Sequence, residues 1–407
     1  MIRSALLFVL ASAFGLVAFL PVVRAQDASP AQVLAPALRP FVDDHSVNSI
    51  SGAVLVVTGP DKVLALETLG YSDLAAQRPM REGAMFWIAS MTKPITAMAV
   101  MMCVEEGKLS IDDPVEKHLP EFRGQMLIEE QSPERVVLKK PARPITVKDL
   151  LTHTSGLTNK LPGGAPMDAL TLQGAVVGYA VSPLQFEPGS KWQYCNPGIN
   201  TLGRLVEVAS GKSYAEFLQE RLFDPLGMRD TTFWPTELQR PRIAKTYKLT
   251  PDKSLVESPG VLGVFSPNLS DHTRMALPAG GLFSTAADLA KLYQMVLSGG
   301  KLGGRQYLKP ETLRQMTTNQ TGDLKVSFTD GMHMGLGFHI VHEPMGVTES
   351  LSPGSFGHGG AYGTQAWIDP VKKIAVVLLI QRFGLPNSDQ SDLRRKLQKA
   401  AAERFGK

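Results

Sequence analysis

Ser90 and Lys93 are the residues whose types and spacing are best suited to chemistry. They lie three positions apart, and Pro94 directly after them fits the first turn of a helix. Side chains three apart on a helix share a face, so the lysine can reach the serine. A neutral lysine can take the serine proton, and the positive end of the helix dipole lowers a lysine pKa and stabilises an oxyanion. The pattern predicts a serine nucleophile activated by a lysine.

A second Ser-x-x-Lys pair, Ser298 and Lys301, is a weaker candidate. It follows a predicted helix end in a glycine-rich loop, where the two side chains would not share a face, and we interpret it as a turn. Tyr194 and Asn196 form the only Tyr-x-Asn in the chain. They lie in a loop just before a predicted helix, where binding groups are often found.

A third candidate group lies near the C-terminal end of the chain, at His358, Gly360 and Ala361. Glycines at this place would let a substrate backbone approach a strand edge. A histidine near neutral pH can supply a hydrogen bond or part of a positive charge. We therefore expect His358 to bind substrate.

Strand pairs near both ends of the chain are predicted to frame these residues. Residues 50–58 and 62–70 are β-rich runs separated by a turn, which predicts a hairpin. Residues 365–368 and 373–381 form a second pair. The second strand of that pair is continuously apolar, which predicts burial on both faces.

The middle of the chain is predicted to be helical. Capping patterns at Thr146 and Ser213 open two helices. Further helices are expected at 31–44, 94–107, 198–210, 285–297 and 388–404. This order predicts an α/β (α+β) fold, with one sheet from about 45–90 and 330–385 and a mostly helical subdomain at about 90–325.

Composition excludes several classes of protein. The chain has 407 residues, 43% hydrophobic and 20% charged, which is typical of globular domains. Its net charge of +4 argues against nucleic acid as a partner. Two cysteines cannot form a disulfide framework. His333, His339 and His342 lack the spacing of a metal site, and no metal or organic cofactor is expected.

The first 25 residues resemble a secretory signal peptide. Arg3 precedes an apolar run, Pro21 ends it, and small residues at Val23 and Ala25 fit cleavage after Ala25. We therefore expect a mature domain of residues 26–407, exported to the periplasm or secreted. No later run reaches the ~20 apolar residues of a membrane span, so no stable membrane insertion is expected after cleavage.

Together and in this order, the three candidate groups resemble the motifs of the serine β-lactamase and penicillin-binding-protein superfamily. The match is to its class C β-lactamase-like branch, which includes DD-peptidases, D-aminopeptidases and family VIII carboxylesterases. The resemblance covers roughly residues 32–384, and the flanking stretches 87–93, 150–157, 187–190 and 279–284 agree with it. It implies a β-lactamase-like fold and a small ester, amide or peptide as substrate.

The resemblance also implies roles for the candidate residues. Ser90 would attack a carbonyl, and Lys93 would accept or relay its proton. Tyr194 would help to protonate the leaving group and later activate water; whether Lys93 or Tyr194 is the base stays open. Asn196 would orient Lys93 or a substrate amide. The N–H groups of Ser90 and Ala361 would form the oxyanion hole.

One departure from the family pattern bears on the substrate. Class C β-lactamases usually carry Lys-Thr-Gly as the third motif, whereas this chain has His358-Gly359-Gly360. The departure favours an esterase-like hydrolase over a β-lactamase. Alternatives are a DD-peptidase or D-aminopeptidase, a β-lactamase, and a penicillin-recognising sensor with little turnover. If His358 reads substrate charge, preference for anionic esters should rise as the pH falls from 8 to 5.5.

Overall fold

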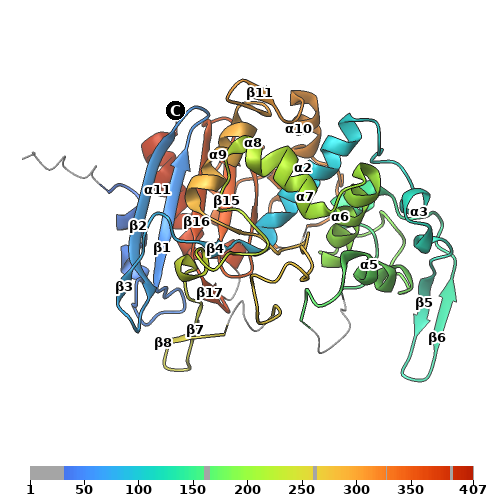
Figure 1. Cartoon of the computed structure of the whole chain (residues 1–407), viewed down its shortest axis with the longest axis horizontal. Helices are drawn as coiled ribbons and strands as arrows, with labels where there is room; N and C mark the ends of the chain where they lie inside the picture. The colour runs from blue at the N-terminus through green and yellow to red at the C-terminus, as the bar shows by residue number, and fades with distance from the viewer. Residues whose placement is uncertain (1–31, 160–165, 260–263, 327, 386–387, 407) are drawn as a thin grey trace, which may run out of the picture. The chain divides into compact units, whose positions relative to one another are not determined.

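The structure is a computed structural model that describes residues 32–159, 166–259, 264–326, 328–385 and 388–406. The described helices and strands belong to one unit, Val33–Lys407 (Figure 1). The predicted signal segment lies outside the described residues. Among the helices that are described, none combines the length and the apolar character needed to cross a membrane.

One large sheet dominates the described part of the chain. It has eight strands in the order β12-β13-β14-β15-β16-β1-β2-β3, and neighbouring strands are antiparallel. Strands from both ends of the sequence meet where β16 pairs with β1. The predicted sheet from both termini is thereby confirmed. The strands are β1 (Gly52–Thr58), β2 (Val63–Asp73), β3 (Arg78–Pro79), β12 (Met332–Met334), β13 (His339–Val341), β14 (Phe356–Gly359), β15 (Gln365–Asp369) and β16 (Ile374–Leu379).

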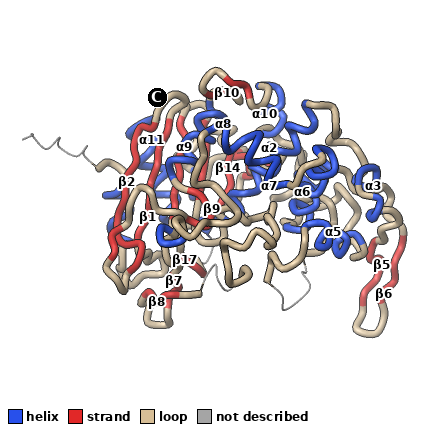
Figure 2. The backbone as a smooth tube through the Cα atoms, in the orientation of Figure 1, coloured by secondary structure: helices blue, strands red, loops and turns tan. Residues whose placement is uncertain are grey.

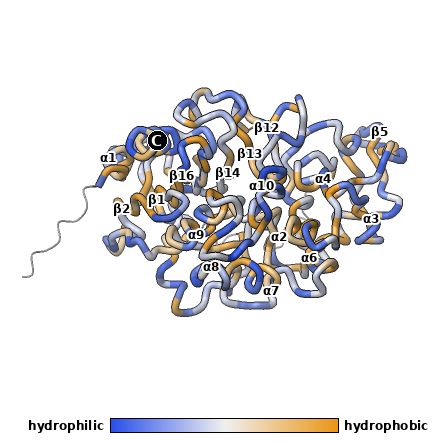
Figure 3. Tube along the Cα trace, turned by 90° about the horizontal axis from the view of Figure 1, so that it is seen from above, coloured by the Kyte–Doolittle hydropathy of each residue, from blue (hydrophilic) through white to orange (hydrophobic). Residues whose placement is uncertain are grey.

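Both faces of the central strands are buried, because successive residues of a strand point to opposite sides. Val54 and Val56 of β1 belong to the larger core, whereas Leu55 and Val57 belong to a second core. Helix α9 (Ala286–Leu297) contacts β1 and β16, and α11 (Asp392–Phe405) contacts β16 and α1 (Ala35–Leu38). Every residue of β16 is buried, as its apolar run predicts. Figure 3 shows these strands as apolar segments inside hydrophilic surface loops.

Helices gather beside the sheet, around α2 and α6, as the tube in Figure 2 shows. Helix α2 contacts both α6 and β14, so it links this helical region to the sheet. Helix α9 falls within the range predicted for the helical subdomain but packs on the sheet. The remaining helices are α2 (Thr92–Glu105), α3 (Val115–His118), α4 (Val147–Leu151), α5 (Leu172–Ala180), α6 (Asn196–Ser210), α7 (Tyr214–Leu218), α8 (Asp224–Leu226) and α10 (Pro310–Met316).

Among the described residues, short strands form four small sheets outside the large one. The β5–β6 hairpin projects beside α3, and β4 leads directly toward the turn that holds Ser90 (Figure 1). Three of these sheets are pairs: β4 (Phe86–Trp87) with β9 (Phe283–Ser284), β5 (Leu127–Gln131) with β6 (Val136–Lys139), and β10 (Lys301–Leu302) with β11 (Arg305–Gln306). The fourth has three strands in the order β17 (Arg382–Phe383), β7 (Tyr247–Leu249) and β8 (Leu255–Glu257).

Local signals placed most helix starts correctly. Thr146 and Ser213 form the predicted capping boxes of α4 and α7. The helix predicted at 31–44 is shorter: α1 ends at Leu38 and a 3₁₀ turn, Arg39–Phe41, follows. Pro40 lies in that turn and cannot donate a backbone N–H to continue the α-helix.

Candidate active site

Ser90 lies at a sharp turn between a strand and a helix. It is the middle residue of the 3₁₀ turn η2 (Ala89–Met91), and α2 begins at Thr92, two residues earlier than predicted. Ala89 has a φ of 46°, a left-handed conformation that is costly for a residue with a side chain. Both neighbours of Ser90 are buried, whereas Ser90 itself is partly exposed. The turn therefore presents the serine hydroxyl at a surface.

Lys93 lies one turn into the helical segment and is fully buried. Its Nζ donates hydrogen bonds to Ser90 Oγ at 2.9 Å and to the Ala279 carbonyl oxygen at 2.5 Å. Within the described residues no carboxylate pairs with it. Burial holds the pKa of Lys93 well below its usual value, because a charged ammonium is poorly solvated there.

Tyr194 approaches the same serine from another segment, the loop before α6. Its hydroxyl donates to Ser90 Oγ at 2.7 Å, and Lys93 Nζ lies 4.7 Å from the centroid of its ring. Burial raises the pKa of the Tyr194 hydroxyl, although its hydrogen bond to Ser90 works in the opposite direction. One serine oxygen therefore lies between a lysine with a lowered pKa and a tyrosine with a raised pKa.

Three histidines lie near Tyr194: His153 follows α4, His358 is in β14, and His339 is in β13 beside His358. The rings of His153 and His358 have centroids 4.7 Å and 6.2 Å from that of Tyr194, and His339 lies 4.9 Å from His358. All three are buried. Burial lowers the pKa of each, to about 4 for His339, so the imidazoles are neutral near pH 7.

The structure fixes how His358 can hydrogen-bond. Its Nδ1 lies 2.7 Å from the carbonyl oxygen of Gly359, which can only accept, so Nδ1 carries the proton. Its Nε2 then presents a lone pair, and among the described residues it has no partner. Two roles were expected for this imidazole near neutral pH, a hydrogen bond or part of a positive charge. Burial and the nearby His339 lower the pKa of His358, which favours the hydrogen bond.

Asn196 is the first residue of α6, and its backbone rather than its side chain has a defined partner. Its N–H donates to Asn159 Oδ1 at 3.0 Å, and Asn159 Nδ2 donates to the Tyr194 carbonyl at 3.0 Å. In the described part of the chain, the Asn196 amide makes no hydrogen bond to Lys93. Asn159 thus holds the backbone of the Tyr194–Asn196 segment through two hydrogen bonds. A single asparagine in a loop does not indicate such a contact in the sequence.

The Ala279 carbonyl oxygen, which accepts the Lys93 hydrogen bond, is positioned by Asn200. Like Asn159, Asn200 was not identified from the sequence. Asn200, buried in α6, accepts the Ala279 N–H through Oδ1 at 3.0 Å and donates from Nδ2 to the Tyr179 hydroxyl at 3.1 Å. The Ala279 carbonyl that receives Lys93 is held in this way. Residues 279–284 carry a family-like pattern in the sequence, but that pattern does not indicate that Asn200 contacts Ala279.

Gly360 and Ala361 lie where β14 ends, and β14 contacts the η2 turn. A Cβ at Gly360 would overlap the Thr364 hydroxyl and lie 2.6 Å from the Ile88 carbonyl oxygen. Thr364 Oγ1 donates to that same Ile88 carbonyl at 3.2 Å. The glycine therefore allows β14 to approach the segment before Ser90, and Ala361 follows it, exposed in the turn.

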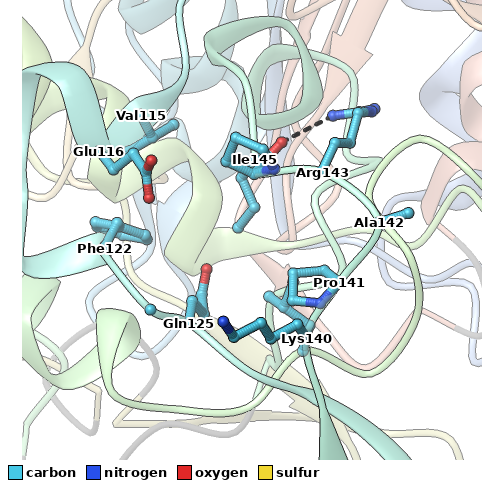
Figure 4. A pocket seen from close by; sticks show the side chains of 12 residues that line it. Val115, Glu116, Phe122, Gln125, Lys140, Pro141, Ala142, Arg143 and Ile145 are labelled. Carbon is cyan, nitrogen blue, oxygen red and sulfur yellow. Dashed lines mark hydrogen bonds between the residues drawn. The ribbon is translucent and has the colours of Figure 1, made fainter.

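A separate cavity of about 280 Å³ lies beside α3 and the β5–β6 hairpin. Figure 4 shows Glu116, Lys140 and Arg143 around it, and Arg143 donates to the Pro144 carbonyl at 3.0 Å. None of its lining residues is one of the seven predicted site residues. No group of three or more potential metal ligands occurs among the residues that the structure describes.

Comparisons with known proteins identify the family of the chain. Residues 37–401 match the protein family described as Beta-lactamase. Esterase EstB of Burkholderia gladioli is 30% identical over 81% of this chain and 85% of its own length. Penicillin-binding protein 4* of Bacillus subtilis is 29% identical over 48% of this chain and 41% of its own. The structure of simvastatin synthase (LovD) from Aspergillus terreus matches in fold, with a TM-score of 0.74, 23% identity and coverage of 92% of this chain and 99% of that one.

Proposed function

The chain belongs to the Beta-lactamase family, and on that premise we propose that it is an esterase-like hydrolase that forms an acyl-enzyme on Ser90. The observation that carries this proposal is the position of Ser90 Oγ, 2.9 Å from Lys93 Nζ and 2.7 Å from the Tyr194 hydroxyl. A nucleophile with a proton acceptor and a proton donor in hydrogen-bonding reach can run acyl transfer.

In the proposed acylation, Lys93 accepts the Ser90 proton as Oγ attacks the carbonyl carbon of the substrate. Burial lowers the pKa of Lys93 well below its usual value, which supports it as the base, and raises the pKa of Tyr194, which argues against a resting phenolate. The N–H groups of Ser90 and Ala361 would stabilise the oxyanion. Collapse of the tetrahedral intermediate expels the alcohol and leaves the acyl group on Ser90.

Tyr194 is suited to pass the proton onward. Its hydroxyl contacts Ser90 Oγ and its ring lies beside Lys93, so it can donate to the leaving alkoxide and be reprotonated from Lys93. In deacylation the same two groups would remove a proton from the attacking water. The neighbouring histidines are neutral and add no competing charge to this relay.

An ester substrate is favoured over a β-lactam by the third motif. His358 replaces the lysine that usually meets a substrate carboxylate in class C β-lactamases, and its imidazole is buried and neutral. The similarity to Esterase EstB, over most of both chains, supports the same choice. A peptidase acting on D-amino-acid peptides, which the resemblance of the three motifs to DD-peptidases and D-aminopeptidases also implies, is the second candidate.

The test is turnover by the purified mature protein on a panel of p-nitrophenyl esters, nitrocefin and D-alanyl-D-alanine peptides. We expect steady hydrolysis of short neutral esters and a loss of at least about a thousandfold in Ser90→Ala, as for a lost nucleophile. Ser298→Ala, in the other Ser-x-x-Lys pair, is the matched control and should stay near the parent. A single burst without turnover would instead support a sensor, and faster peptide cleavage the peptidase.

We also propose that the protein is exported and cleaved after Ala25. The proposal rests on the charged start, apolar run and small residues of the first 25 positions. Intact-mass spectrometry of extracytoplasmic protein should give a chain that begins at Gln26. A membrane-bound chain that still begins at Met1 would contradict it.

A further inference from the structure

His153 lies just after α4, at a position where helices usually carry glycine. Helix α4 ends at Leu151, Thr152 is its C-cap, and His153 follows with a φ of 60°. A left-handed residue at this place is most often glycine or asparagine, and a larger side chain is strained there. The side chain is nevertheless retained and is 1% exposed. The strain indicates that this imidazole does something that glycine could not.

His153 holds the backbone on both sides of Tyr194. Its carbonyl oxygen accepts the Gln193 N–H at 2.9 Å, and its Nδ1 accepts the Cys195 N–H at 3.1 Å. Because a backbone N–H can only donate, Nδ1 carries the lone pair and the proton lies on Nε2. Two hydrogen bonds from one residue thus fix the residues before and after Tyr194.

The imidazole also packs against the Tyr194 ring. The two ring centroids are 4.7 Å apart and the planes are 39° from each other. The Tyr194 hydroxyl, at the far end of that ring, donates to Ser90 Oγ at 2.7 Å. His153 is therefore placed to set the position of this hydroxyl through the tyrosine and the backbone around it.

Packing alone does not explain why the residue is a histidine. A phenylalanine would cover the Tyr194 ring without burying a polar nitrogen. His153 Nε2, in contrast, is buried and has no partner in the part of the chain that the structure describes. A buried N–H without a partner is costly, so the acceptor that Nδ1 offers to Cys195 is what favours histidine here.

We propose that His153 is a positioning residue, which holds the Tyr194 hydroxyl against Ser90 by accepting the Cys195 N–H. The inference rests on the proposed function, since it concerns the proton that Tyr194 gives to the leaving group at the same site. A proton donor must lie within hydrogen-bonding reach of the oxygen that it protonates, so a small displacement of the hydroxyl weakens proton transfer.

The experiment compares phenyl butyrate with p-nitrophenyl butyrate, which share one acyl group. Phenolate is the more basic leaving group, so its departure depends more on a proton from Tyr194. The measured quantity is the ratio of kcat/KM for phenyl butyrate to that for p-nitrophenyl butyrate. A loss of folded enzyme lowers both rates and leaves the ratio unchanged, whereas a displaced hydroxyl lowers the ratio. Tyr194→Phe gives the ratio without the donor.

Two substitutions separate the acceptor of His153 from its ring. His153→Phe keeps a ring without an acceptor, and we expect the ratio to fall about fivefold, a part of the roughly hundredfold that a positioned proton donor contributes. His153→Asn keeps an acceptor near the place of Nδ1 and suits a positive φ, so its ratio should stay within about twofold of the parent.

His272→Phe is the matched control, because His272 also stacks on an aromatic ring, that of Trp234 at 4.7 Å. It should leave the ratio unchanged. Thermal unfolding checks that each variant folds. If His153→Phe does not fold, His153→Ala, which also lacks the acceptor, takes its place.

The outcomes separate this inference from the proposed function. An unchanged ratio in a folded variant without the acceptor, or an equal fall in His153→Asn, would overturn the positioning role and leave the serine hydrolase standing. A ratio that is also unchanged in Tyr194→Phe would show that Tyr194 is not the proton donor, and the positioning role would fall with it. If the parent hydrolyses neither ester, the proposed function itself fails.

Discussion

At the scale of single residues, the site depends on opposite pKa shifts at two neighbours of one oxygen. Burial lowers the pKa of Lys93 and raises that of Tyr194, and both contact Ser90 Oγ. An exposed lysine would be protonated at neutral pH and useless as a base. The residue types could be read from the sequence, whereas the burial that makes them functional could not.

The first prediction concerns the pH profile of kcat/KM for a neutral ester. Because burial lowers the pKa of Lys93, this residue loses its proton well below pH 10.5, so the rate should rise with pH and become level before pH 10. Tyr194 stays protonated over this range because its pKa is raised. Initial rates from pH 5 to 10 test this, and a rate that keeps rising to pH 10 would contradict it.

The second prediction concerns His358 and reverses the expectation from sequence. Because burial lowers the pKa of His358 well below 6.5, it stays neutral from pH 8 to 5.5. The ratio of kcat/KM for an anionic ester to that for its neutral analogue should be flat over this range. The measurement is the same ratio in the parent and in His358→Gln; a rise on acidification that vanishes in the variant would restore a charge-reading histidine.

At the scale of elements, the helices and strands follow local sequence patterns, whereas the contacts between them do not. The capping boxes of α4 and α7 and the buried β16 strand follow local patterns and were predicted from them. Asn159 and Asn200 were not, because each acts on residues distant in sequence through single hydrogen bonds. Periodicity and capping report local structure, but they carry no information about such tertiary contacts.

The third prediction uses Gly360, which lets β14 approach the segment before Ser90. Gly360→Ala would place a Cβ 2.6 Å from the Ile88 carbonyl and against Thr364, so the strand end must move. We expect kcat/KM to fall by at least about tenfold, since a small displacement of catalytic groups is costly.

Gly178→Ala is the matched control for this substitution. Gly178 lies in α5, and a Cβ there would meet nothing within 4 Å. Alanine should leave kcat/KM unchanged and stabilise the fold by about 0.5–1 kcal/mol, because glycine is a poor helix former. Equal activity in both variants would show that the close approach at Gly360 is not required.

At the scale of the whole molecule, burying three neutral histidines makes the fold sensitive to acid. His153, His339 and His358 have folded pKa values below 6.5, so below that pH the unfolded chain binds protons that the folded chain does not. The stability they contribute is present above pH 6.5 and is lost as the pH falls toward their folded values.

The fourth prediction follows from this linkage. Lowering the pH from 7.5 to 5.5 should reduce the free energy of unfolding by about 1.4 kcal/mol for each of the three histidines. Asp113 and Asp149, whose pKa values are lowered by their partners, titrate below this window. Urea unfolding at the two pH values measures the change, and equal stability at both would mean that the histidines are not buried as neutral groups.

The measurement that tests the central claim most directly is acid-quenched mass spectrometry of the protein during turnover of a p-nitrophenyl ester. We expect a mass increase equal to the acyl group, located by peptide mapping on Ser90, absent in Ser90→Ala and retained in Ser298→Ala. An acyl group on any other residue, or ester hydrolysis by a folded Ser90→Ala protein at the parent rate, would contradict the assignment of Ser90 as the nucleophile.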